Sequence, residues 1–184
     1  MRRLMFLLFL ATPLAAQTEV GIIVGHADAG STDAGGTTLS FDHGRAYGVT
    51  VEENSLELAA MSLRYDGALR TGGASASMGS LRLLPISLTA RRQLGKFYAG
   101  LGVAYVKASA LSSSDLDSLG IGRIDVESKV CWLANAGIVF PLHSFSVIID
   151  GRYFAYRPQS GPPDARVRLN LKPVVISAGI RWKL

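Results

Sequence analysis

The sequence of 184 residues contains one cysteine and, after its first 16 residues, no long apolar segment. A single cysteine excludes an internal disulfide. The lack of a run of about 18 apolar residues beyond residue 16 excludes a transmembrane helix there. Charged residues are scarce at 18% and hydrophobic residues reach 48%, which excludes intrinsic disorder. The mean hydropathy of +0.27 is high for a soluble domain, so two classes remain: a protein with an ordinary buried core, or a membrane β-barrel.

The first 16 residues are typical of a secretory signal peptide. Arg2 and Arg3 form a basic start, an apolar stretch runs over residues 4–14, and Ala16 is a small residue of the kind that signal peptidase accepts. A buried N-terminal helix is the other interpretation, and Pro13 and the short length argue against it. We therefore expect residues 1–16 to be a signal peptide and residues 17–184 to be one barrel domain.

Alternation with a period of two residues predicts strands with one apolar and one polar face. In residues 97–105, Phe97, Leu101 and Tyr105 share a face, whereas Gly100 and Gly102 share the other. Three consecutive strand pairs can be aligned so that their apolar faces coincide. These alignments pair Leu88 with Leu101, Ile138 with Phe145 and Val51 with Leu56. In the last pair Met61, Leu63 and Tyr65 break the alternation, which indicates a β-bulge.

The composition of the two faces favours a membrane barrel over a soluble one. Glycine and alanine crowd the polar face, which suits a narrow lumen better than a solvated surface. The aromatic residues gather near the two ends of the strands, as in the two girdles of barrels that cross a membrane. The predicted girdle residues are Tyr47, Tyr65, Phe97, Tyr105, Phe140, Phe145, Tyr153 and Trp182.

The strand count indicates an eight-stranded antiparallel up-and-down transmembrane β-barrel, an all-β fold. We expect strands over 18–27, 44–53, 55–66, 80–92, 96–108, 124–140, 144–157 and 167–184. The connections alternate between short turns and the long segments 28–43, 67–79, 109–123 and 158–166. Short periplasmic turns and long outer loops are the habit of such barrels. Every backbone group finds a partner only if the first strand pairs with the last.

Two segments resemble those of a known family. The stretch from Phe97 to Tyr105 resembles the central strand of small eight-stranded outer-membrane barrels, the group that includes OmpW-type proteins, opacity proteins and OmpA-type membrane domains. The stretch from Lys172 to Leu184 is similar to the last strand of that family, although Lys183 and Leu184 follow Trp182 where the family ends on an aromatic residue. The resemblance implies a location in the cell outer membrane and recognition of the last strand by the barrel-insertion machinery.

Charged residues on the inward face predict an internal network of ion pairs, because unpaired charges in a narrow lumen are costly. The alternative interpretation is a narrow polar path for small molecules, including hydrophobic ones; eight strands are too few for a general-diffusion porin. The residues assigned to this network are Glu57, Arg91, Glu127, Lys129, Asp150, Arg152 and Arg181, with Glu19 and Glu52 on the same face.

A second set of basic residues has outward parity at the outer strand ends: Arg45, Arg64, Arg82, Lys107 and Arg157. Our hypothesis is a basic collar that contacts phosphates of lipopolysaccharide, since an arginine fork suits them. The alternative is ordinary snorkelling of long cationic side chains at the membrane interface.

No residue pattern indicates catalysis, a cofactor, a metal site or nucleic-acid binding. His26, Asp28, Asp33, Asp42 and His43 match no compact ligand motif. For a lipid A-modifying enzyme, His143 and Ser146 are close in sequence, but they lie at a periplasmic turn in the wrong leaflet. We therefore predict a non-enzymatic outer-membrane barrel with a structural or surface-interaction role.

Overall fold

The computed structural model describes residues 18–34, 36–41, 43–72, 74–118, 123–160 and 167–184. The predicted signal peptide lies outside the described residues. Eight strands form the wall of the molecule: β1 (Glu19–Asp28), β4 (Gly44–Glu53), β5 (Leu56–Thr71), β6 (Ala74–Leu94), β7 (Phe97–Ala108), β8 (Lys129–Pro141), β9 (Phe145–Phe154) and β12 (Val174–Lys183). The other elements are short: β2 (Gly30–Ala34), β3 (Thr37–Phe41), α1 (Ser114–Ser118), β10 (Gln159–Ser160) and β11 (Val167–Arg168).

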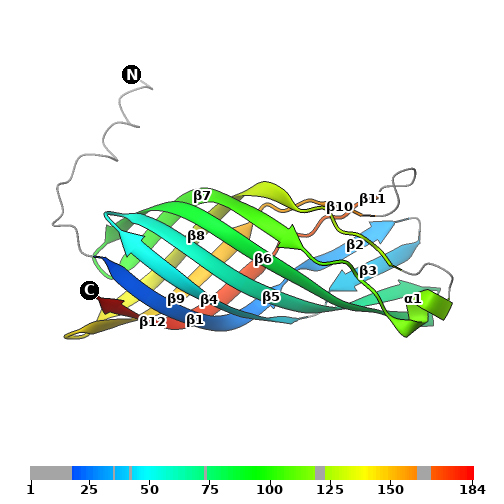
Figure 1. Ribbon diagram of the computed structural model, residues 1–184, viewed down its shortest axis with the longest axis horizontal. Coiled ribbons are helices and arrows are strands. Elements are labelled where there is room, and N and C mark those ends of the chain that lie inside the picture. Colours follow the sequence, from blue (N-terminus) through cyan, green and yellow to red (C-terminus); the bar gives the residue numbers. More distant parts are fainter. Residues whose placement is uncertain (1–17, 35, 42, 73, 119–122, 161–166) are drawn as a thin grey trace, which may run out of the picture.

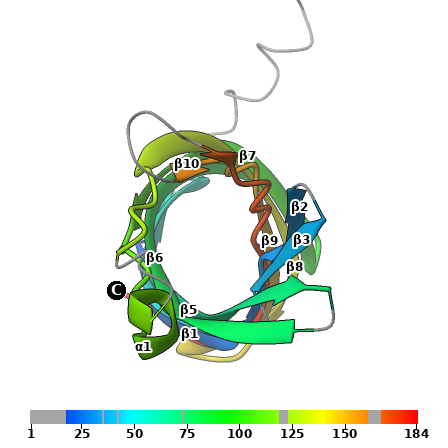
Figure 2. The same ribbon diagram turned by 90° about the vertical axis from the view of Figure 1, so that its right-hand side faces the viewer.

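The wall is a closed antiparallel ring. Each strand pairs with its neighbour along the chain, and the ring closes between β1 and β12, where Ile22 lies opposite Ile180 and Glu19 opposite Lys183. The expected closure of the first strand on the last is thus confirmed, as is the all-β barrel fold. Figure 1 shows the barrel from the side and Figure 2 shows the ring from one end.

The side chains alternate along the wall, and the large apolar ones face outward. Leu101 is 72% exposed and Trp132 is 73% exposed, whereas the inward residues Ala104 and Leu133 are buried. Glycine on the inward face is a steric requirement in at least one place, because a Cβ on Gly102 would lie 2.1 Å from the carbonyl oxygen of Leu88. Outward apolar residues around a crowded interior are the inverted pattern that the sequence predicted.

The faces of the residues used to align the three strand pairs are as predicted, but the three predicted registers are wrong. Leu88 lies opposite Val103, Val51 opposite Leu58 and Ile138 opposite Ile149. The β6–β7 turn is tighter than predicted and the β4–β5 turn is shifted by one residue, since two-residue loops join these strands. The β8–β9 loop is longer than predicted, because Pro141 pairs with Ser146. Asn54 and Ser55 have φ of 49° and 71°, and Gly95 has φ of 64°, the left-handed conformations that two-residue hairpin loops require. An even shift leaves every side chain on its face.

The two ends of the barrel differ. We call the end with these tight turns the turn end, and the opposite end, which carries β2, β3 and α1, the loop end (Figure 1). Much of the expected loop 67–79 is strand, because β5 and β6 continue beyond the ring and pair as far as Thr71 and Ala74. The hairpin β2–β3 joins this extension through pairing of β3 with β5. Conversely, residues 124–128 and 169–173, which we expected in strands, lie outside the named strands.

No helix in the described parts of the chain is both long enough and apolar enough to cross a membrane.

Candidate functional site

The interior of the turn-end half holds a group of ion pairs, which we call the charged cluster: Glu52, Glu57, Arg91, Asp150, Arg152 and Arg181. Glu57 is its centre and its side chain is fully buried. The carboxylate lies 2.6 Å from Nη2 of Arg91, 3.1 Å from Nη1 of Arg152 and 3.0 Å from Nη2 of Arg181. One carboxylate thus joins three guanidinium groups that come from three separate strands, β6, β9 and β12.

Asp150 is the second fully buried acid of the charged cluster. It accepts hydrogen bonds from the hydroxyl of Tyr98 and from Nε of Arg152, and Nη2 of Arg91 lies 3.3 Å from it. The guanidinium of Arg91 also lies 4.4 Å from the ring centroid of Tyr98, a cation–π contact. Sequence parity placed Tyr98 on the inward face, but nothing in the sequence distinguished its hydroxyl as a partner of Asp150.

Glu52 completes the charged cluster at its more exposed edge. Its carboxylate lies 3.0 Å from Nη1 of Arg91 and also pairs with Arg181, while Glu19 lies 4.0 Å from Arg181. Three acids and three arginines therefore balance within the charged cluster. Close pairing offsets the cost of burying these charges and joins β4, β5, β6, β9 and β12 across the interior.

Two residues predicted for this network lie elsewhere. Glu127 and Lys129 are at the loop end, about 40% exposed, where their charged groups are 3.9 Å apart. The reason is that β8 begins only at Lys129, so residue 127 does not follow the inward alternation. Glu127 instead accepts a hydrogen bond from the backbone N–H of Gln159, and its carbonyl accepts one from the Tyr156 hydroxyl (2.5 Å). Burial raises the pKa of that Tyr156 hydroxyl.

The interior of the loop-end half is apolar. Its buried side chains, which we call the apolar cluster, are Leu63, Tyr65, Leu81, Leu83, Phe154 and Tyr156. Tyr65 is fully buried, so its assignment to an outward girdle is wrong. The β-bulge predicted near residues 61–65 is also wrong, because the β5–β6 register shifts only between Gly67 and Ala68. Met61, Leu63 and Tyr65 stay in alternation, and it is the interior that changes from charged to apolar.

The other predicted girdle residues face outward or are partly exposed. Phe97 and Trp182 lie near the turn end, and Tyr105 and Tyr153 lie nearer the loop end. The remaining ones are Tyr47, Phe140 and Phe145, of which Phe145 is the least exposed.

Three of the five predicted collar residues are direct neighbours. Arg45 lies opposite Arg64, and Arg64 lies opposite Arg82, so the three form an arginine row across β4, β5 and β6. All three are exposed on the outside of the wall. Lys107 lies opposite Leu84, two residues along β6 from Arg82, and continues the row. Like charges directly opposite one another repel, so the row favours an anion beside it.

Arg157 does not belong to the arginine row. It follows β9, which pairs with β8 and β12 and is therefore separated from β4, β5 and β6 in the ring. It is exposed, but it lies on a different part of the wall. The predicted collar is thus a row on one side of the barrel plus one separate cation.

Histidines extend the arginine row on β1. His26 lies opposite Arg45, and its ring centroid lies 4.9 Å from that of His43, which is 3.8 Å from the Asp28 carboxylate. Asp42 lies outside the described residues. No group of three His, Cys, Asp or Glu side chains among the described residues has the arrangement to hold a metal ion.

The serine and histidine considered for lipid hydrolysis do not come together. Ser146 is buried on the inward face of β9, opposite Arg181 of β12, whereas His143 is exposed in the β8–β9 turn. The sole cysteine, Cys131, is buried on the inward face of β8.

Comparison with known proteins places the fold. The chain is similar to the crystal structure of Neisserial surface protein A (NspA), with a TM-score of 0.58 and 16% identity over 91% of this chain and 97% of that one. It is also similar to the outer membrane protein AlkL in DMPC lipid bilayers, with a TM-score of 0.53 and 15% identity over 95% and 92% of the two chains. Both are small eight-stranded outer-membrane barrels, so the resemblance expected from the sequence is confirmed for the fold. No protein-family model and no curated protein sequence matches the chain.

Proposed function

We propose that the signal sequence of residues 1–16 directs export and that the barrel spans a bacterial outer membrane. The observation that carries this proposal is the outer surface, where large apolar side chains such as Leu101, Trp132 and Ile176 are 65–73% exposed while ionised groups are buried inside. In water, each of these exposed apolar side chains would raise the free energy of the folded barrel. In a bilayer the same side chains face hydrocarbon.

Fractionation of cells that express the full chain tests this location. We expect the protein in the outer-membrane fraction, with a gel mobility that changes on boiling because the closed barrel resists unfolding by the detergent. A protein that stays soluble without detergent and migrates identically before and after boiling would contradict the proposal.

The role that the geometry supports best is non-enzymatic: a structural barrel that interacts with lipopolysaccharide at the loop end. The balanced charged cluster holds the interior together, and the arginine row supplies exposed forks for phosphate groups. The extended sheet of β2, β3, β5 and β6 projects beyond the ring and offers a surface to other ligands.

Charge reversal at the centre of the arginine row tests the lipopolysaccharide contact. Arg64→Glu should lower the lipopolysaccharide that co-purifies with the barrel by about fivefold, since it replaces attraction with repulsion between two remaining arginines. Arg157→Glu makes the same change in charge on another part of the wall and serves as the control. Equal effects of the two variants would indicate general snorkelling rather than a specific contact.

We also propose that β12 serves as the recognition segment for the barrel-insertion machinery. Its outward residues Val174, Ile176, Ile180 and Trp182 are all exposed apolar groups. Trp182→Ser should slow assembly in cells while leaving the ion pairs of the folded barrel intact. Normal assembly of this variant would argue against a role for the aromatic residue.

A second candidate function is the passage of small apolar molecules, which the apolar cluster favours. A molecule that enters at the loop end meets Leu81 and Leu83 and is then blocked by the charged cluster. Next to the apolar cluster the β5–β6 register lacks the pairs of Met61 and Ser62, because Pro85 has no N–H to donate. This seam is a place for sideways exit to the bilayer.

Planar-bilayer recordings and an apolar fluorescent probe separate the two functions. A channel should show discrete conductance, and an apolar path should bind phenylnaphthylamine in a way that Leu83→Trp abolishes. A barrel with neither property has the structural role alone.

A further inference from the structure

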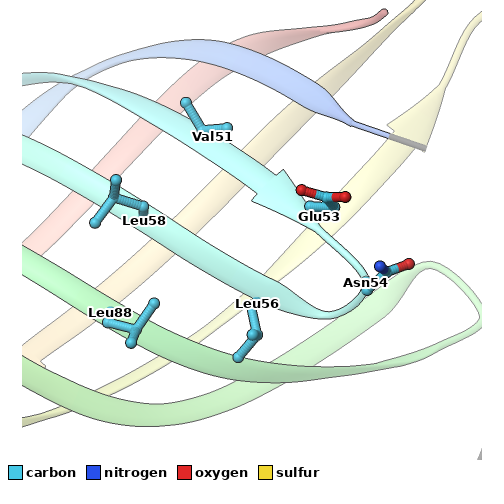
Figure 3. Close-up of a pocket in the computed structure, with 6 residues that line it drawn as sticks. All are labelled: Val51, Glu53, Asn54, Leu56, Leu58 and Leu88. Carbon is cyan, nitrogen blue, oxygen red and sulfur yellow. The ribbon is translucent and has the colours of Figure 1, made fainter. Parts of the chain in front are cut away.

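A groove lies on the outside of the barrel at the turn end, where β4, β5 and β6 run side by side. Its volume is about 340 Å³, and its lining residues are Val51, Glu53, Asn54, Leu56, Leu58 and Leu88. Figure 3 shows Val51, Leu58 and Leu88 on three successive strands, with Glu53 and Asn54 at the hairpin tip. This groove belongs neither to the charged cluster nor to the arginine row.

Four aliphatic side chains give the groove an apolar floor. Leu58 lies directly between Val51 of β4 and Leu88 of β6, so the three form a continuous strip across the wall. Leu56, Leu58 and Leu88 are each 50–52% exposed. Such a strip suits a hydrocarbon chain, which gains free energy from each methylene group that it buries.

One end of the groove carries a negative charge. Glu53 is the last residue of β4 and is exposed, and the Asn54 amide follows it in the tight turn. Among the described residues, no ion pair includes Glu53. The carboxylate therefore lies at the end of an apolar strip. A lipid with a cationic headgroup could place its acyl chain on the strip and its headgroup beside the carboxylate.

We propose that this groove binds one phospholipid with a primary-ammonium headgroup, such as phosphatidylethanolamine. Its acyl chain lies on Leu56, Leu58 and Leu88, and its ammonium group contacts the Glu53 carboxylate. Charge complementarity favours this occupant, because the exposed Glu53 carboxylate attracts an ammonium group, whereas an apolar chain without a cationic head makes no contact with that charge. The arginine row, at the far end of the same three strands, selects the opposite charge.

This inference rests on the proposed location in a membrane, so the experiment separates the two. The full-length mature barrel is assembled in nanodiscs of phosphatidylethanolamine and phosphatidylglycerol in equal amounts with identical acyl chains. A change in gel mobility on boiling first establishes insertion, and native mass spectrometry then identifies the lipid that stays bound. Failure to insert would overturn the proposed function, whereas insertion without retained phosphatidylethanolamine would overturn only the lipid site.

We expect phosphatidylethanolamine to be retained at the groove, beside any phosphatidylglycerol that the arginine row holds, and we expect Glu53→Gln to lower the retention of phosphatidylethanolamine by about fivefold. Glu53→Asp keeps the charge and should keep the retention. Asp66→Asn removes an outward carboxylate from β5 at the loop end, away from the groove, and should leave the retention of phosphatidylethanolamine unchanged. Leu58→Trp fills the strip and should lower retention of both lipids. Retention of phosphatidylethanolamine that Glu53→Gln leaves unchanged would overturn the proposal.

Discussion

The two halves of the barrel interior are filled by different kinds of side chain. The turn-end half is filled by the charged cluster, in which Glu57 contacts three arginines, while the loop-end half is filled by Leu63, Leu81 and other apolar side chains. Ion pairs are directional and fail when one partner is removed, whereas apolar side chains tolerate some rearrangement. We therefore expect the turn-end half to set the geometry of the ring and the loop-end half to tolerate change.

The largest effect is expected at the centre of the charged cluster. Glu57→Ala should lower the free energy of unfolding by about 3 to 5 kcal/mol, because it leaves three buried guanidinium groups without their shared acid. The measurement is urea unfolding in lipid vesicles, followed by the fluorescence of Trp132 and Trp182. Glu57→Gln keeps the volume and should lose nearly as much, so a near-neutral Glu57→Gln would show that shape rather than charge matters here.

A cavity in the apolar cluster should cost somewhat less. Leu81→Ala should lower the free energy of unfolding by about 2 to 3 kcal/mol in the same assay, through lost transfer free energy and an unfilled space. Leu101→Ala removes the same atoms from the outward face outside the groove, where lipid replaces the lost contacts, and serves as the matched control. Equal losses in both variants would mean that the loop-end interior is not tightly filled.

A single hydrogen bond of the charged cluster gives a smaller effect. Tyr98→Phe removes the hydroxyl that donates to Asp150 and should cost about 1.5 kcal/mol, because Asp150 keeps its two arginine partners. Tyr105→Phe, on the outward face of the same strand, should change stability very little. A loss no larger than that of Tyr105→Phe would show that the hydrogen bond from Tyr98 to Asp150 does not stabilise the barrel.

The smallest effect is expected where a polar atom has no partner. The hydroxyl of Thr89 is buried and makes no hydrogen bond to the described residues, so Thr89→Val should change the free energy of unfolding by less than about 0.5 kcal/mol. A clear loss would reveal a water molecule that Thr89 holds inside the charged cluster. The contrast with Tyr98→Phe shows which polar groups stabilise the turn-end half.

The sequence predicts faces better than positions along them. The parity of Leu101 and Trp132 correctly indicated an inverted barrel, because alternation is a local property of each strand. The register of Val51 against Leu58 was missed, because it depends on whether Asn54 and Ser55 adopt left-handed conformations. A shift by two residues still pairs apolar residues with apolar residues on the same face, so the alternation cannot distinguish the two registers.

The candidate sites show the same limit. Glu57, Arg91, Asp150, Arg152 and Arg181 lie on the inward face as parity predicts, and the ring closure brings them together. Tyr65 was misplaced, because its inward position depends on where the interior changes from charged to apolar. Glu127 was misplaced, because its position depends on where β8 begins. Neither of these features can be predicted from the alternation of apolar and polar residues within one strand.

The closure of β1 on β12 has a consequence for how the chain folds. Glu19 and Lys183 come from opposite ends of the barrel sequence, and the N–H of Leu184 donates to the carbonyl of Thr18 at 2.9 Å. The seam that completes the ring therefore closes the longest loop in the chain, which makes it the entropically most demanding contact. Until it forms, the edges of β1 and β12 are unpaired and can pair with other chains, so ring closure competes kinetically with aggregation.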